Sequence, residues 1–175
     1  MRNAKEFGAA FDTTIWPHIP KEGEISSEAI EQHPFHQLFS SGNEGLQQMV
    51  SRGETVLQYM RGVVNIHVGN AVSKTLKANP GFSPPSAPVK VVNCTTLTSE
   101  VGNALASQQN VSCSLMFSVL SSGSIKCSMR SCFGKPENPA AADVSKIALA
   151  LGGGGHKCAA SFVVKTYNDF LDLFE

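Results

Sequence analysis

The sequence has no excess of either charge and no long apolar run. Its 175 residues carry 14 Lys and Arg against 14 Asp and Glu, a formal net charge of zero. This balance excludes a protein that holds nucleic acid by bulk positive charge, so any contact with nucleic acid has to come from a local pocket. No apolar run approaches the ~20 residues of a membrane span, and the N-terminus lacks the pattern of a secretory signal. We therefore expect a cytoplasmic protein that does not bind a membrane.

Paired-cysteine motifs and large aromatic side chains are also scarce. The five cysteines, at positions 94, 113, 127, 132 and 158, form an odd number and include no Cys-x-x-Cys. This usage is typical of reduced, mostly buried thiols rather than of a disulfide-linked protein or a zinc site. Aromatic residues make up 7% of the chain, with ten Phe, two Tyr and one Trp. We expect few of them to be exposed as the stacking surfaces on which broad RNA binders depend.

The chain contains enough apolar material for one domain with an extension. Hydrophobic residues make up 42% of it, which suffices for a proper core at this length. We predict an irregular or helical extension and linker over residues 1–85, followed by a domain over residues 86–175. Apolar residues from Leu46 to Val64 recur at spacings of three and four, which predicts an amphipathic helix within residues 44–78. Four prolines in residues 79–88 then predict a loop.

Strand and helix patterns alternate after this loop. The predicted elements are a strand at Val89–Cys94, a helix from residue 99, a hairpin of Val111–Leu120 and Ser124–Ser131, a helix at 144–151, a strand at 161–166 and a helix at Tyr167–Phe174. Ser99 and Asp143 are the expected N-caps of the first two helices. This order predicts an α/β (α+β) fold, in which helices pack on a mixed β-sheet.

Four consecutive glycines, Gly152–Gly155, are the most informative local feature. They follow an apolar helix pattern and precede His156 and Lys157. Because glycine has no Cβ and adopts positive φ readily, a ligand can approach the backbone N–H groups there. We predict that a helix restarts at His156–Ala160 and that its free N–H groups favour a phosphate or carboxylate. The run matches neither a P-loop nor a dinucleotide fingerprint, and a flexible connector or a tight turn is the alternative.

The glycines are part of a longer ordered pattern. Arg130-Ser131 comes first, then Asp143-Val144-Ser145-Lys146-Ile147-Ala148, then the glycines with His156, Ala159-Ala160 and Phe162. This pattern, within residues 89–164, resembles the C-terminal signature of the DHH (Asp-His-His) phosphoesterase superfamily. The signature lies in the associated domain that follows the catalytic domain. Ser161 departs from it, because the family usually has glycine there.

The resemblance implies a domain that binds the phosphate and the terminal nucleoside of a substrate. The residues that it assigns to phosphate binding are Arg130, Ser131, Gly152, Gly153, Gly154, Gly155 and His156. The planar fork of Arg130 suits bidentate contact with a phosphate, and a solvent-exposed arginine at a strand end is the alternative. The implied ligands are phosphorylated small molecules or short single-stranded nucleic acids, including short oligonucleotides and cyclic dinucleotides.

A second segment, Ser99-Glu100-Val101-Gly102-Asn103, also resembles part of this family domain. We interpret its roles as helix capping and close packing at Gly102. Cys158 lies two residues from His156, and at a helix start the two side chains would diverge, so we do not interpret it as a nucleophile.

The residues that two-metal hydrolysis requires are missing. The family resemblance implies two divalent metals, usually manganese, held by Asp and His motifs of the catalytic domain. This chain has aspartates only at 12, 143, 169 and 172 and contains no Asp-His-His, whereas such a centre needs several carboxylates and imidazoles. His33 and His36 flank a Pro-Phe pair and do not form a metal site. We therefore expect no catalytic residue and no cofactor in this chain, with manganese only in a full-length parent.

These expectations leave three function classes. The first is the substrate-binding domain of a DHH-type phosphoesterase, either as the C-terminal part of a longer enzyme, partnered by the catalytic domain, or as a separate binding module. The second is a non-catalytic nucleic-acid-binding module of the type appended to alanyl-tRNA synthetases. The third is a structural or dimerisation domain, for which a homodimer is one possible state of the chain.

Overall fold

The computed structural model describes residues 5, 6, 9, 36 and 40–175 of the chain. The chain divides into two compact units, residues 1–62 and 63–175. Most of the predicted extension before residue 40, with His33 of the His-Pro-Phe-His run, lies outside the described residues. Among the residues that are described, no helix combines the length and the apolar composition that a bilayer span requires.

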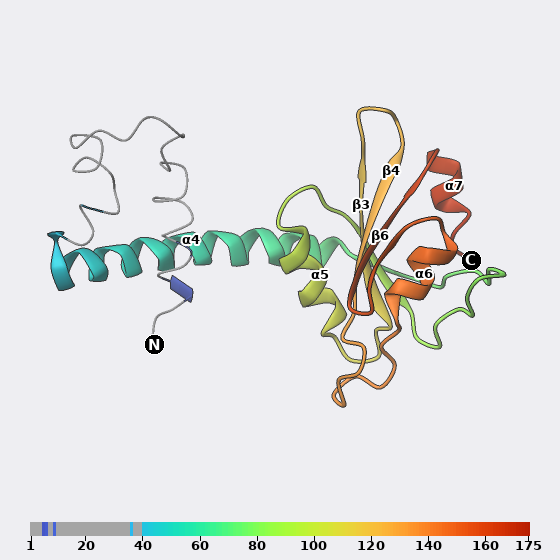
Figure 1. The fold of residues 1–175 in the computed structure, drawn as a ribbon, viewed down its shortest axis with the longest axis horizontal. Helices are drawn as coiled ribbons and strands as arrows, with labels where there is room; N and C mark the ends of the chain where they lie inside the picture. The colour runs from blue at the N-terminus through green and yellow to red at the C-terminus, as the bar shows by residue number, and fades with distance from the viewer. Residues whose placement is uncertain (1–4, 7–8, 10–35, 37–39) are drawn as a thin grey trace. The chain divides into compact units, whose positions relative to one another are not determined.

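A six-stranded mixed sheet forms the centre of residues 63–175 (Figure 1). Its strands are β1 (Val72–Lys74), β2 (Val89–Asn93), β3 (Cys113–Val119), β4 (Ile125–Arg130), β5 (Gly154–His156) and β6 (Ala159–Val164). The order across the sheet is β1-β2-β3-β4-β6-β5. Strands β2 and β3 run parallel, and the other neighbours run antiparallel. A parallel pair needs a crossover connection, which contains the helix α5 (Thr98–Ala106).

Helices cover both faces of the sheet, so the predicted fold class is confirmed. Figure 1 shows α5 on one side and α6 (Val144–Ala150) with α7 (Tyr167–Leu171) on the other. Val144, Ile147 and Ala148 of α6 and Phe170 of α7 join the larger buried core with residues of β2, β3, β4 and β6. A smaller core lies at α5 and is made of Val92, Cys94, Val101, Leu105 and Met116.

Strand β4 sends its side chains alternately to the two faces, as its sequence predicts. Ile125, Cys127 and Met129 are buried, whereas Lys126, Ser128 and Arg130 are exposed or half-buried. The period of two is that of a pleated strand. The face that carries Arg130 is therefore the polar face of this strand.

The amphipathic pattern before residue 79 does form a helix, α4 (Gly42–Asn70), but the helix ends before residue 78. Residues 72–74 leave it to form β1, in which Val72 pairs with Val91 of β2. Pairing with a neighbouring strand satisfies the backbone of these residues in place of helical hydrogen bonds, a tertiary effect that the local pattern does not contain. The domain boundary at residues 85/86 stays a prediction.

Of the two predicted helix N-caps, one is confirmed and the other is wrong. Asp143 is the N-cap of α6, as predicted, and its side chain accepts a hydrogen bond from the Ser145 N–H. The prediction for Ser99 is wrong: Leu97, at a φ of 49°, is the N-cap of α5 and no side chain caps the helix. The Ser99 hydroxyl instead accepts a hydrogen bond from Arg130.

The C-terminal helix α7 is shorter than the predicted Tyr167–Phe174. It begins with a capping box, in which Thr166 and Asp169 exchange hydrogen bonds between side chain and backbone. It ends at Leu171, and Phe174 then forms an isolated bridge with Leu76. Phe174 is buried in the larger core, so burial of its ring accounts for the early end of the helix.

Candidate functional site

The first glycines of the run end α6. Gly152, at a φ of +78°, donates its N–H to the Leu149 carbonyl, and Gly153 donates to the Ala148 carbonyl. This pair of hydrogen bonds is a Schellman motif, in which the residue after the C-cap takes a left-handed conformation that glycine adopts without strain. Gly152 therefore has a structural role at the helix end.

The helix predicted at His156–Ala160 is wrong. Gly154–His156 form strand β5, which turns back through Lys157 and Cys158 to pair with β6. A Cβ at Gly153 would overlap Phe162 and the Ser161 carbonyl, and a Cβ at Gly155 would lie 2.5 Å from the Ala159 carbonyl oxygen. The absence of side chains thus lets β5 lie close against β6. A backbone anion site at a new helix terminus is not formed.

Gly154 differs from the glycines beside it. It is exposed, its φ is not positive, and a Cβ there would meet no atom within 4 Å. Neither packing against the described residues nor a positive φ requires a glycine at this position. Gly154 therefore leaves open space in front of the backbone, as Gly152 does, but it lacks the role that Gly152 has in ending α6.

Arg130 and His156 lie in one row across the sheet. Arg130 of β4 pairs with Ala159 of β6, and Ala159 pairs with His156 of β5. Directly opposed residues of antiparallel strands point to the same face, and two such steps separate their Cα atoms by roughly 10 Å. The small side chain of Ala159 stands between the two long basic ones. We call these three residues the Arg130–His156 row.

Two neutral oxygen atoms hold the guanidinium of Arg130. Nη2 donates to Ser99 Oγ at 2.9 Å, and Nη1 donates to the Met129 carbonyl at 3.1 Å. Because both acceptors are uncharged, these bonds do not neutralise the positive charge. Arg130 is half-buried and His156 is exposed, so both remain open to solvent.

The other predicted contact at this end of β4, Ser131, is buried. Its hydroxyl donates to the Ser112 carbonyl at 3.4 Å and accepts from the Phe133 N–H at 3.1 Å. The hydroxyl is thus engaged inside the fold, and its contact with phosphate stays a prediction. Lys157, next to His156, places its Nζ 5.8 Å from the centre of the Phe133 ring, an arrangement typical of a cation–π contact.

The thiols and carboxylates of this unit do not form a reactive cluster. Burial raises the pKa of the Cys113 and Cys127 thiols to about 12, which keeps them protonated. Cys158 is exposed, and its thiol donates to the Phe133 carbonyl. Among the residues that the structure describes, no three His, Cys, Asp or Glu side chains come together in a group that could hold a metal ion.

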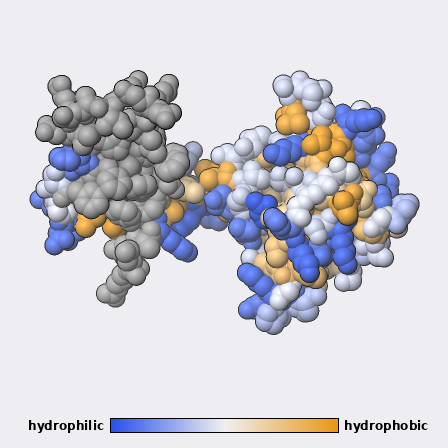
Figure 2. Space-filling model, in the orientation of Figure 1, coloured by the Kyte–Doolittle hydropathy of each residue, from blue (hydrophilic) through white to orange (hydrophobic). Residues whose placement is uncertain are grey.

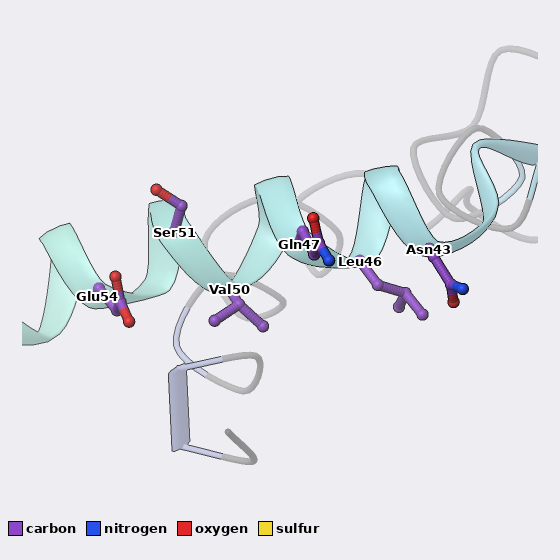
Figure 3. Close-up of a pocket in the computed structure, with 6 residues that line it drawn as sticks. All are labelled: Asn43, Leu46, Gln47, Val50, Ser51 and Glu54. Atoms are coloured by element: carbon purple, nitrogen blue, oxygen red, sulfur yellow. The ribbon is translucent and has the colours of Figure 1, made fainter. Parts of the chain in front are cut away.

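Two hollows of the surface were not predicted from the sequence. One, of about 390 Å³, is lined by one face of α4, where Figure 3 shows Asn43, Leu46, Gln47, Val50, Ser51 and Glu54. The other, of about 450 Å³, is lined by Ser107 and by Cys132, Gly134, Lys135, Pro136, Glu137 and Asn138 of the loop after β4. Neither is lined by a residue of the Arg130–His156 row. The first hollow is lined by a helix face and the second mainly by an irregular loop. Neither lining has a sequence motif from which it could have been predicted.

The surface of residues 63–175 is mixed in character. On the face drawn in Figure 2, hydrophobic residues appear as separate groups among hydrophilic ones. Val163 of β6, the register partner of Lys126 on β4, is 52% exposed. Binding here therefore depends on a few placed groups rather than on one extended surface of a single kind.

Comparison with known proteins bears on the fold. No family model matches the chain, and no curated protein is similar to it in sequence. The fold is similar to a solved structure described as "pGpG-specific phosphodiesterase - PggH from Vibrio cholrae", with a TM-score of 0.51 at 10% sequence identity. The match covers 94% of this chain and 54% of the other, so the chain spans about half the length of that protein. At this identity the likeness concerns the fold.

Proposed function

We propose that residues 63–175 form a substrate-binding domain. This domain binds a phosphate of a phosphodiester, together with the nucleoside next to that phosphate. The domain would serve a phosphoesterase of the DHH type. The observation that carries the proposal is the Arg130–His156 row, which sets two basic side chains on one face with only Ala159 between them. The signature resemblance and the fold likeness to a phosphodiesterase support the same class.

The chemistry of the row suits an anion. Arg130 offers a planar fork of donors, and a protonated His156 offers donors on both ring nitrogens. Each hydrogen bond between charged groups contributes about 1.5–3 kcal/mol before the costs of association. Two or three such bonds on an open surface are consistent with micromolar to millimolar affinity. Gly154, with open space before its backbone, leaves room for the ligand beside His156.

The metal centre of such an enzyme does not fit the residues of this chain. The described residues hold no group of three metal-ligating side chains, and the full sequence has four aspartates and no Asp-His-His. Chemistry at a metal would therefore have to be supplied by residues outside this sequence. What this chain's own side chains contribute is binding and orientation of the phosphate.

Titration with the dinucleotide pGpG, followed by NMR of the ¹⁵N-labelled full chain, tests the proposal. We expect shifts of Gly154, His156 and Arg130 resonances on one binding curve, and loss of most affinity in Arg130→Ala. Lys146→Ala, at an exposed position of α6 on the other face, is the matched control and should bind as the parent does.

Two results would overturn the proposal. The first is a set of shifts confined to residues away from β4, β5 and β6. The second is affinity that falls steeply with salt and depends on many lysines alike, which is the behaviour of a general nucleic-acid-binding module. That second result would favour the synthetase-type alternative.

A further inference from the structure

We infer that Ser99 and Gly102 of α5 are positioning residues, which hold the Arg130 guanidinium in place for phosphate. This inference rests on the proposed function of Arg130. It assigns a role to the Ser99–Asn103 segment that differs from helix capping, since Ser99 caps nothing in the structure.

The hydrogen bonds to Arg130 fix its direction and still leave its fork usable. The guanidinium has five N–H donors. One of them goes to Ser99 Oγ and one to the Met129 carbonyl. Three donors remain, enough for a bidentate contact with a phosphate. Ser99 itself is exposed, so its contact with Arg130 lies at the surface where a ligand arrives.

Gly102 lets α5 come close enough for this contact. A Cβ at Gly102 would lie 2.7 Å from Arg130 Cγ and 2.5 Å from Met116 Cε, closer than real Cβ contacts come. Any larger residue would therefore push the stem of Arg130 or the helix away. The alkyl stem of Arg130 thus runs directly across the backbone of α5 at this point.

A buried serine ties the helix to the strand at the same level. Ser114, the register partner of Arg130 on β3, donates from Oγ to the Gly102 carbonyl at 2.8 Å. The same hydroxyl lies 3.4 Å from the carbonyl of Arg130. The Arg130 backbone, its stem and its guanidinium are therefore each held by a separate contact. A side chain that is already ordered loses less conformational freedom when it binds, which favours affinity.

The order of Arg130 can be measured without any ligand. The Nε–Hε signal of Arg130, assigned by its disappearance in Arg130→Lys, should show a high heteronuclear NOE in the parent. Ser99→Ala should lower this NOE markedly. Ser107→Ala removes the same hydroxyl from the other end of α5, where it bonds the Asn103 carbonyl, and should leave the NOE unchanged. Equal order of Arg130 in the parent and in Ser99→Ala would overturn the inference.

Titration with the dinucleotide pGpG then tests whether the order of the Arg130 side chain affects binding. Ser99→Ala should raise the dissociation constant about fivefold, the usual cost of ordering one long side chain on binding, with an unchanged melting temperature. Ser99→Thr, which keeps the hydroxyl, should restore binding to within about twofold, and Ser107→Ala should have no effect. Gly102→Ala should raise the dissociation constant more than Ser99→Ala does. Its packing clash should also lower the melting temperature.

The decisive comparison is made in Arg130→Lys, whose ammonium lacks the fork. There, Ser99→Ala should cause no additional loss, because the contact that it removes is already gone. An equal loss in both backgrounds would mean that Ser99 acts independently of Arg130, which contradicts the inference. If the parent chain does not bind pGpG at all, the proposed function fails, whereas the NOE measurement still decides whether Ser99 holds Arg130.

Discussion

At the scale of single residues, the glycines of the run 152–155 have different structural roles. Gly152 closes a helix at positive φ, whereas Gly153 and Gly155 lie against β6. Gly154 has neither demand. Substitution along the run therefore separates the structural glycines from the one beside the proposed ligand.

Gly153→Ala should lower the free energy of unfolding by about 2 kcal/mol or more, because its Cβ would overlap backbone and Phe162. Gly154→Ala is the matched control and should change stability by less than about 0.5 kcal/mol. Urea unfolding at neutral pH measures both. Equal losses at the two positions would show that the run does not pack against β6 as described.

The ring of His156 should contribute to binding. We expect His156→Gln to raise the dissociation constant of pGpG, because the amide replaces a ring that can carry donors on both nitrogens. Lys157→Ala removes only the neighbouring exposed charge and should have a smaller effect. Calorimetric titration measures both variants, and equal affinity of the parent and His156→Gln would exclude a contact between His156 and the phosphate.

At the scale of single elements, α6 is defined by signals within its own segment. Asp143 begins the helix and the glycines end it. The hydrogen bond from the Ser145 hydroxyl, with a smaller contribution from the Ser145 N–H, holds the pKa of the Asp143 carboxyl below its ordinary value of 3.8, against a smaller opposing effect of burial. A pKa lowered by folding means that the ionised cap stabilises the fold above the ordinary value. This stabilisation is lost as the pH falls through 3.8 and below.

Asp143→Ala should accordingly reduce the free energy of unfolding at pH 7 by about 1 kcal/mol, the usual effect of removing an N-cap. Asp143→Asn keeps an acceptor oxygen and should lose less. Between about pH 5 and 3 the parent should lose more stability than Asp143→Asn, since only the parent has a carboxylate to protonate. Urea unfolding across this range is the measurement, and identical pH dependence in both proteins would contradict the assigned role.

Elements defined by distant partners were predicted less well than α6. The β4 alternation and the hairpin of β3 and β4 are local patterns, and both are confirmed. β1 and β5 are three-residue edge strands whose existence depends on pairing with β2 and β6. His156–Ala160 therefore resembled a helix in the sequence, although these residues belong to the β5–β6 hairpin. Likewise Ser99 resembled an N-cap, because its partner Arg130 lies 31 positions away.

At the scale of the whole molecule, the position of Arg130 relative to His156 depends on the order of the strands in the sheet. The sequence predicted the fold class and the strand that carries Arg130. It could not place Arg130 and His156 in one row, because that placement follows from the pairing of three strands, β4, β6 and β5. Sheet order across the molecule is the information that the local patterns lacked.

The purified chain should show no phosphodiesterase activity with Mn²⁺, Mg²⁺ or Co²⁺. Two-metal hydrolysis needs several carboxylate and imidazole ligands, and this sequence has four aspartates and no Asp-His-His. Release of GMP from pGpG, followed by chromatography, is the assay. Turnover that persists at constant specific activity through successive purification steps would show that the chain carries a catalytic centre of its own.

The most direct test of the central claim is a double-mutant cycle between Arg130 and His156. The dissociation constant of pGpG is measured for the parent, Arg130→Ala, His156→Ala and the double variant, with unfolding curves to show that each is folded. If both side chains bind the same phosphate, their effects should be coupled by more than about 0.5 kcal/mol. Independent, additive losses would mean that the two residues do not share a phosphate, and the Arg130–His156 row would not be the binding site.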